Sequence, residues 1–255
     1  MELSLKGKVA IVTGGSQGIG AAISLSFARS GAVVLINHLP VKRDVEGFES
    51  VKNEIESFGG RCLSVSGDIT DSSFCTTLCD TAVKEFGSLD ILVNSAGFTR
   101  AVKSNEITDA LWKNGIEVNL SAAFYTARAA QDHMARVGYG RIIFIGSSGS
   151  ITGGGGSAFY SAAKAGINGL VRSLSKELAP RGITVNAVLP ALIETDLLRN
   201  RHSEPEQRKA LVDRIPVGRL GQPDDVANMV LFLASEKAGF VSGQQIIVDG
   251  GSTYK

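Results

Sequence analysis

One stretch near the start of the chain reads Val9-Ala10-Ile11-Val12-Thr13-Gly14-Gly15-Ser16-Gln17-Gly18-Ile19-Gly20. An apolar, β-branched run leads into a glycine turn, and a helical pattern follows as far as Arg29. Such a turn lets backbone N–H groups and a helix N-terminus approach a pyrophosphate. The spacing is Gly14-xxx-Gly18-x-Gly20, not the general GxGxxG, so a plain tight turn is the alternative. Its place at the first strand-to-helix junction favours a nucleotide site.

Beyond this stretch, short apolar runs of strand length alternate with segments of helix length. Strands that are buried on both faces of a parallel sheet read as continuous apolar runs, and right-handed crossovers between them build a doubly wound sheet. The sequence therefore predicts an α/β fold, a Rossmann-type doubly wound parallel sheet with helices on both faces. The expected strands cover 9–12, 33–36, 91–93, 141–145, 184–189 and 245–248, with a weaker run at 62–65.

Helix-ending residues agree with this alternation. Asp71 is expected to cap a helix over 72–86, and Gly87 to end it. A second helix is expected to start near Ser157 and to close at 180–182.

No linker, repeat or charge block divides the chain, so residues 1–255 are expected to form one domain. The one low-complexity stretch is Gly153 to Gly156. Residues 196–216 are polar and helical in pattern, and they are predicted to form a mobile substrate lid.

Composition limits the classes of partner. With 26 basic and 25 acidic residues the net charge is +1, which gives no electrostatic reason to expect nucleic acid or a membrane surface as a partner. The three cysteines lack a metal-ligand spacing and suit a reducing compartment. No signal-peptide pattern and no apolar stretch of membrane-spanning length is present, so a cytoplasmic protein is expected.

The end of the second strand bears on the choice of nucleotide. A dinucleotide fold usually places an acid there to hold the ribose diol, whereas this chain has Asn37 and His38. Lys42 and Arg43 follow, and they are either phosphate partners or solvated surface residues. Asp68 follows the third strand and is a candidate for adenine contact, because Asp71 already serves as the helix cap.

Candidate chemical groups lie further along the chain. Tyr160 and Lys164 are four residues apart at the start of an expected helix, so they share one face. A nearby ammonium lowers the pKa of a phenol and makes it usable as an acid or base. Taken alone, such a pair also fits a solvated helix face. Ser147 follows a strand at the sheet edge that binds ligands, and Ser148 competes with it for the same role.

These residues together resemble the classical short-chain dehydrogenase/reductase family over nearly the whole chain. Thr13 to Gly20 resembles its glycine motif, and Asn94-Ser95-Ala96-Gly97 resembles its Asn-Asn-Ala-Gly motif. Its catalytic tetrad is matched in order by Asn119, Ser147, Tyr160 and Lys164. Ser147 stands thirteen residues before Tyr160, which favours it over Ser148.

The resemblance implies a role for each tetrad residue. Tyr160 donates the proton in reduction, Ser147 hydrogen-bonds the substrate oxygen, and Asn119 positions a water in a proton relay. Lys164 lowers the pKa of Tyr160 and holds the nicotinamide ribose. No metal site is expected. The implied cofactor contacts are Gly14, Ser16, Gln17, Gly18, Ile19, Gly20, Asn37, His38, Asp68, Ile69, Asn94, Ala96, Gly97, Tyr160, Lys164, Pro190, Ile193 and Thr195.

Two residues depart from the family pattern. Ser95 replaces the second Asn of the Asn-Asn-Ala-Gly motif, and little loss is expected from it. Ala191 replaces a Gly after Pro190, and its methyl group is expected to constrain the backbone beside the nicotinamide.

Within the family, the C-terminal half resembles 3-oxoacyl-(acyl carrier protein) reductases, whereas residues 34–59 look more like sugar and polyol dehydrogenases. The sequence predicts a weak preference for NADP(H) with NAD(H) still usable, and a small-molecule carbonyl or alcohol substrate. Family resemblance also implies a homotetramer, and a face of small residues offers a packing surface: Ala158, Ser161, Ala162, Ala165 and Gly169. A nucleotide-binding regulator without catalysis is the remaining alternative.

Overall fold

The structure, a computed structural model, describes residues 3–201 and 204–253. Seven strands form one parallel sheet in the order β3-β2-β1-β4-β5-β6-β7. Every expected strand is confirmed, including the weaker run at 62–65. The strands are β1 (Val9–Thr13), β2 (Val33–His38), β3 (Arg61–Ser66), β4 (Ile91–Asn94), β5 (Gly140–Ile145), β6 (Ile183–Pro190) and β7 (Gln245–Val248).

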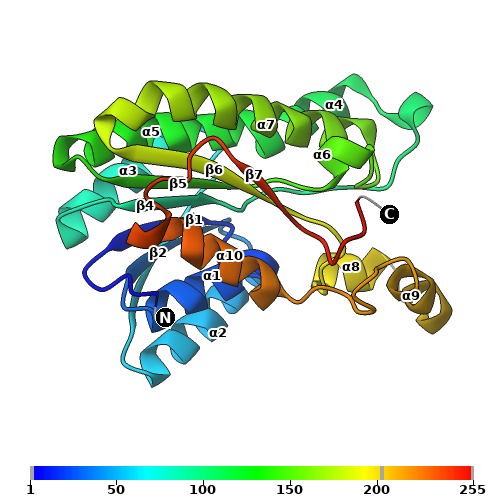
Figure 1. Cartoon of the computed structure of the whole chain (residues 1–255), viewed down its shortest axis with the longest axis horizontal. Coiled ribbons are helices and arrows are strands. Elements are labelled where there is room, and N and C mark those ends of the chain that lie inside the picture. Colours follow the sequence, from blue (N-terminus) through cyan, green and yellow to red (C-terminus); the bar gives the residue numbers. More distant parts are fainter. Residues whose placement is uncertain (1–2, 202–203, 254–255) are drawn as a thin grey trace.

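Helices cover both faces of this sheet (Figure 1). One face is covered by α1 (Gly18–Arg29), α2 (Lys42–Ser57) and α10 (Pro223–Ala234), and the other by α3 (Ser72–Phe86), α5 (Ala122–Val137) and α7 (Ala158–Leu178). Alternate side chains of β1 enter the two cores, Ile11 one and Val12 the other. Because both faces of the inner strands are buried, those strands are largely apolar, whereas the edge strand β3 is partly exposed and carries Arg61, Ser64 and Ser66. The predicted doubly wound fold is confirmed.

The helix ends explain why these elements begin and stop where they do. Asp71 Oδ1 accepts a hydrogen bond of 2.8 Å from the Ser73 amide at the start of α3, and Gly87, with φ 84°, ends that helix. Both predicted caps are confirmed. Ser157 is the N-cap of α7, and Gly182, with φ 77°, follows the closing 3-10 turn.

Strand order reverses beside β1, which lies between β2 and β4. Crossovers on the two sides of such a point leave in opposite directions, and a crevice opens at the carboxyl ends of the strands. Thr13 and Asn94 end the two strands at this position. The fold therefore directs the glycine turn and the residues after β4 and β5 toward one end of the sheet.

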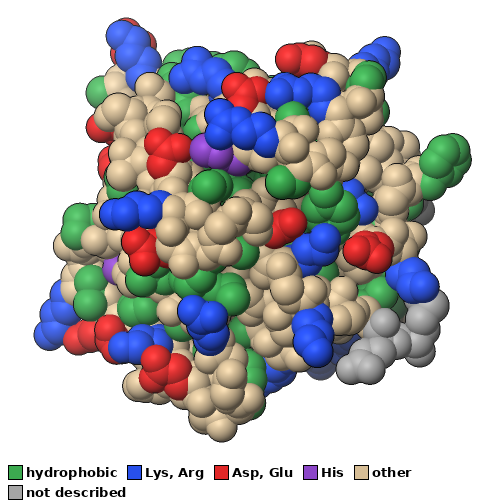
Figure 2. All heavy atoms as spheres, turned by 90° about the vertical axis from the view of Figure 1, so that its left-hand side faces the viewer, with side chains coloured by type: hydrophobic (Ala, Val, Ile, Leu, Met, Phe, Trp, Pro, Cys, Tyr) green, Lys and Arg blue, Asp and Glu red, His purple; other side chains and the backbone are tan. Residues whose placement is uncertain are grey.

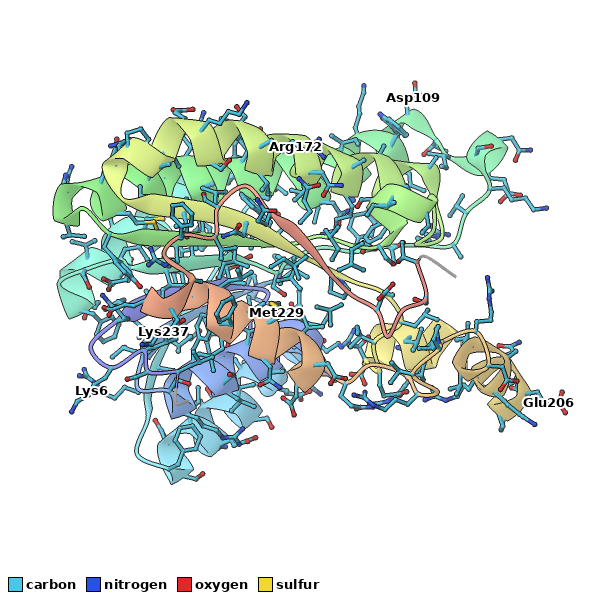
Figure 3. All side chains as sticks on the ribbon, in the orientation of Figure 1. Lys6, Asp109, Arg172, Glu206, Met229 and Lys237 are labelled. Carbon is cyan, nitrogen blue, oxygen red and sulfur yellow. The ribbon has the colours of Figure 1, made fainter. Side chains whose placement is uncertain are left out.

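A small lobe extends beyond that end (Figure 1). It contains α8 (Asp196–Arg201) and α9 (Pro205–Val212), and Leu198, Ile215 and Leu220 form its own apolar cluster. Glu206 of α9 points outward at its far end (Figure 3). This lobe corresponds to the predicted insertion 196–216, of which residues 202–203 lie outside the described residues.

The remaining helices line the same end of the sheet or lead toward it. They are α4 (Asp109–Ile116), which a π-helical turn at Glu117–Ser121 joins to α5, and α6 (Gly149–Thr152). On the face shown in Figure 2, Lys and Arg side chains are interspersed with Asp and Glu. Among the described helices, none combines the length and the apolarity needed to cross a bilayer.

Candidate active site

Three of the predicted catalytic side chains meet where β5 ends and α7 begins. The Tyr160 side chain is hydrogen-bonded to Ser147, and Ser147 Oγ accepts a bond of 3.1 Å from the Gly149 amide. One turn further along α7, Lys164 Nζ lies 5.7 Å from the centroid of the Tyr160 ring and donates to the Ile145 carbonyl at 2.8 Å. The structure thus brings Ser147 to Tyr160, whereas Ser148 serves as the N-cap of α6.

Burial sets the protonation of this group. It raises the pKa of the Tyr160 phenol, and the hydrogen bond with Ser147 opposes that rise only in part. Burial also lowers the pKa of Lys164 to about 8. The net pKa of Tyr160 is therefore raised, because removal of the phenol from water outweighs the hydrogen bond with Ser147. The lowering of this pKa by Lys164 stays a prediction.

Asn119 lies in the π-helical turn, and its buried amide group holds the backbone around it. Nδ2 donates to the carbonyls of Phe98 and Gly115 at 3.0 Å each, while Oδ1 accepts from the Phe98 amide at 3.2 Å. A Cβ atom on Gly97 would lie 2.7 Å from Asn119 Oδ1 and 3.5 Å from Lys164 Nζ. Asn119 and Lys164 therefore both lie against Gly97. Single π-helical turns often occur at functional sites.

The glycine turn packs directly on the segment after β4. Thr13 Oγ1 accepts hydrogen bonds from the amides of Ser95 at 3.1 Å and Ala96 at 3.2 Å. Gly14 has φ 61°, and a Cβ there would lie 2.9 Å from the Ala96 Cα. A side chain at position 14 would thus separate the two segments. Ser95 contributes its backbone amide here, which any residue except proline would supply.

Asn94 supports the same region from inside the fold. Its Oδ1 accepts a hydrogen bond of 2.5 Å from Thr126 Oγ1, and its Nδ2 donates to the Ala123 carbonyl at 3.4 Å. The side chain therefore ties the end of β4 to α5.

At the adenosine end, the two residues that close β2 have internal partners. Asn37 Nδ2 donates to the carbonyls of Val65 and Gly67 at 3.1 Å each. His38 places Nε2 2.8 Å from Ser64 Oγ and Nδ1 2.8 Å from the Leu39 carbonyl. Both side chains are buried.

The next two candidates at this end differ in exposure. Asp68 is exposed beyond β3 and accepts from the Thr70 amide at 2.9 Å, whereas Ile69 is buried in the core. Of these two side chains, only Asp68 is open to a ligand.

A polar cluster that sequence reasoning missed lies beside the glycine turn. Gln17 Nε2 donates to Asp44 Oδ1 at 2.8 Å and to the Arg43 carbonyl at 3.3 Å. Arg43 Nη2 lies 3.5 Å from Asp196 Oδ2 at the start of α8. Lys42 Nζ lies 3.8 Å from Glu46 Oε1, one turn further along α2. An acidic residue in the first turn of a helix indicates only that the helix begins there. Nothing in the sequence indicates that Asp44 contacts Gln17.

The segment after β6 forms the opposite wall of the crevice. A Cβ on Gly18 would lie 3.3 Å from the Thr195 Cγ2, so Thr195 faces the glycine turn. Ile193 is buried and pairs with Gly221. Ala191 follows Pro190 at the end of β6, and no described non-glycine residue has a positive φ. The expected constraint at Ala191 therefore brings no backbone strain.

These donors fit a nicotinamide dinucleotide. The glycine turn presents backbone amides at the start of α1, as a pyrophosphate requires. Within the described part of the chain, Lys164 Nζ has one protein acceptor, the Ile145 carbonyl. An ammonium has three donors, so the group retains capacity for ribose hydroxyls. No cluster of His, Cys, Asp and Glu among residues 3–201 and 204–253 has the arrangement of a metal site.

The fold and the site define an NAD(P)-dependent oxidoreductase that transfers a hydride between a nicotinamide and a carbonyl or secondary alcohol. A family model described as Enoyl-(Acyl carrier protein) reductase matches residues 14–253. The chain belongs to the short-chain dehydrogenase/reductase family, as its motifs indicated.

Similar proteins act on different substrates. The 3-oxoacyl-(acyl-carrier-protein) reductase of Escherichia coli is 40% identical over 250 residues, 98% of each chain. The L-rhamnose 1-dehydrogenase (NAD(P)(+)) of Azotobacter vinelandii is 39% identical over 245 residues, 96% of each. A crystal structure of a 7α-hydroxysteroid dehydrogenase with NADH and 7-oxo glycochenodeoxycholic acid is 34% identical, has a TM-score of 0.91, and is matched over 98% of this chain and 96% of that one.

Proposed function

We propose that Tyr160 is the general acid of this enzyme in carbonyl reduction and the general base in alcohol oxidation. The observation that carries the proposal is the hydrogen bond between Tyr160 and Ser147 beside the buried Lys164. A bound nicotinamide supplies or accepts the hydride. Because burial raises the pKa of Tyr160, the phenol keeps its proton at neutral pH and is ready to donate it.

The other three residues of the proposed tetrad assist this transfer. Ser147 Oγ, already paired with Tyr160, directs the substrate oxygen toward the same proton. Lys164, as a cation, attracts developing negative charge on the phenol and binds ribose hydroxyls. Asn119 fixes the carbonyls of Phe98 and Gly115 next to Lys164, where they support a water in a relay toward solvent.

Tyr160→Phe tests the central assignment, because it keeps the ring and deletes the transferable proton. The rate should fall on the order of 10²–10⁴-fold, while the cofactor dissociation constant, followed by nicotinamide fluorescence, should change little. A Phe variant that keeps more than half of the rate would show that another group transfers the proton, and the assignment would be wrong.

The preferred cofactor is proposed to be NADP(H), with NAD(H) still used. No acidic residue ends β2, so no carboxylate is present there to hydrogen-bond a ribose diol or to repel a 2′-phosphate. Lys42 and Arg43, both exposed, are the candidate partners for that phosphate, and we propose Arg43. An exposed charge pair contributes about 1 kcal/mol or less, which corresponds to a preference of several-fold. Comparison of kcat/KM for the two cofactors measures it directly.

For the substrate, we propose a 3-oxoacyl thioester, with a sugar or polyol as the second candidate. The first is supported by similarity to the Escherichia coli reductase and the second by similarity to the rhamnose dehydrogenase. Cofactor oxidation or reduction across acyl thioesters, ketones and sugars separates them. A higher kcat/KM for a sugar than for every thioester would exclude the first candidate.

The assembly is proposed to be a homotetramer in which α7 packs on a neighbour's copy. A groove between α5 and α7 is lined by Leu120, Phe124, Gly166, Gly169 and Leu170, among others. Phe124 at its edge is 36% exposed. Small residues on α7 permit the close approach of a second helix. We propose a cytoplasmic location, which the free thiols of Cys62, Cys75 and Cys79 support.

A further inference from the structure

Four consecutive glycines, Gly153 to Gly156, connect α6 to the segment that leads into α7 and Tyr160. Gly153 ends α6 with φ 74°, and Gly155 and Gly156 have φ values of 97° and 99°. L-residues rarely adopt these values. The run is therefore a specific backbone path rather than an unstructured spacer.

Hydrogen bonds hold this path from two sides. Thr99 Oγ1, from the segment after β4, donates to the Gly155 carbonyl, and the Val102 amide donates to the Gly156 carbonyl at 3.0 Å. From α7, Ser161 Oγ donates to the Gly154 carbonyl at 2.6 Å. The loop is thus tied both to the wall of the crevice and to the helix that carries Tyr160.

Gly155 lies directly against the Tyr160 ring. A Cβ atom at Gly155 would lie 2.6 Å from Tyr160 Cε1 and closer still to Cδ1, whereas Cβ atoms in real structures essentially never approach another atom within 3.0 Å. Gly153 differs in this respect, because a Cβ there would meet no atom within 4 Å. The backbone of Gly155 therefore forms one side of the space that the Tyr160 ring occupies.

We propose that Gly155 and Thr99 are positioning residues for Tyr160: the loop backbone at Gly155, held by the Thr99 hydroxyl, fixes the ring so that its oxygen meets Ser147. The inference rests on the proposed role of Tyr160. The ring cannot tilt toward Gly155 without displacing the loop backbone. Since proton transfer requires a fixed distance between donor and acceptor, the support acts on the rate and not on cofactor binding.

Gly155→Ala and Gly153→Ala form a matched pair of tests. Both place an L-residue at a positive φ, but only the first meets the Tyr160 ring. A displacement of the order of 1 Å near a reacting group costs up to about 10²-fold in rate, so Gly155→Ala should lower kcat about 10–100-fold. It should leave cofactor KM within about twofold, since its contact is with the ring alone. Gly153→Ala should keep most of the wild-type kcat.

Substitutions at Thr99 provide an independent test of the same role. Thr99→Val removes the hydroxyl at nearly constant volume, and loss of one hydrogen bond should lower kcat about fivefold. Thr99→Ser keeps a donor and should restore most of the rate. In Gly155→Ala the phenol loses its bond with Ser147, so the pH midpoint of alcohol oxidation should also rise.

The outcomes separate this inference from the proposed function. If Tyr160→Phe is inactive while Gly155→Ala and Gly153→Ala both keep the wild-type kcat, the positioning role is wrong and the proposed function stands. An equal loss of kcat in both alanine variants would also overturn the positioning role, because backbone strain alone would explain the result. An active Tyr160→Phe variant would remove the proposed function and, with it, this inference.

Discussion

Lys164→Met is expected to abolish most activity and at the same time to stabilise the protein without cofactor. Lys164 is 5% exposed, and burial lowers its pKa from the ordinary 10.5 to about 8. The fold therefore disfavours the ammonium that the reaction requires. A methionine has similar length, no charge and enough flexibility to fill the same space.

The size of the gain follows from the two pKa values. The fall from 10.5 to about 8, at about 1.4 kcal/mol for each pKa unit, corresponds to about 3 kcal/mol. The variant also loses the hydrogen bond from Nζ to the Ile145 carbonyl, and an unpaired buried acceptor costs about 1 kcal/mol or more. The net gain in the free energy of unfolding near neutral pH should thus be about 1–2 kcal/mol.

The pH dependence identifies the cause. Below pH 8 the lysine is protonated in both states, so the folded protein carries the full cost. Between about 8 and 10.5 the unfolded chain binds more protons than the folded one, and wild-type stability rises with pH. The advantage of Lys164→Met should therefore be largest near pH 7 and should shrink as the pH rises to about 9.5.

Urea unfolding of both proteins at the two pH values measures this difference. Tyr160→Phe is the matched control: it is also expected to be inactive, but it removes no buried cation. Its stability relative to wild type should not change between these pH values. A Lys164→Met variant that is less stable than wild type at pH 7, or whose advantage grows with pH, would refute the reasoning.

Three further results are expected. Arg43→Gln should lower kcat/KM for NADPH several-fold and leave that for NADH nearly unchanged; equal losses for both cofactors would remove Arg43 from phosphate recognition. Limited proteolysis should cut first within 196–216, and cofactor with substrate should protect that segment; a first cut elsewhere that ligands do not affect would count against a lid. Light scattering coupled to gel filtration should show a tetramer that Phe124→Arg dissociates, and a fully active wild-type monomer at micromolar concentration would contradict this.

The fold could be predicted because its signals are local. The inner strands are buried on both faces, so they read as continuous apolar runs, whereas β3 at the sheet edge is partly exposed and corresponds to the weaker run at 62–65. The caps of α3 required only Asp71 and Gly87, which flank the helix directly. Parallel strands joined by helices then leave few topologies.

The adenosine end could not be predicted in the same way, because its contacts cross between strands. Asn37 is 28 and 30 residues from the carbonyls it meets on Val65 and Gly67, and His38 is 26 residues from Ser64. Gln17 and Asp44 are 27 residues apart. In each of these pairs, the sequence around one residue does not indicate which residue it contacts. The resemblance gives Asn37 and His38 as cofactor contacts, and the structure shows that both side chains also have hydrogen-bond partners within the protein.

The catalytic group shows a different limit, which concerns sign rather than position. The spacing of Tyr160 and Lys164 correctly places them on one face of α7, but it also suggested that the ammonium lowers the pKa of the phenol. That sign depends on how much water the surrounding chain removes from each group, and β5, the loop at Gly155 and the segment after β4 all contribute to it. Burial raises the pKa of Tyr160 and lowers that of Lys164, so both shifts favour the neutral forms. At neutral pH Tyr160 is neutral, whereas Lys164, with a pKa of about 8, still carries its charge at a cost in desolvation, so ligand contacts that stabilise the ammonium offset that cost. The same desolvation that makes Lys164 costly to the fold therefore couples its protonation to cofactor binding.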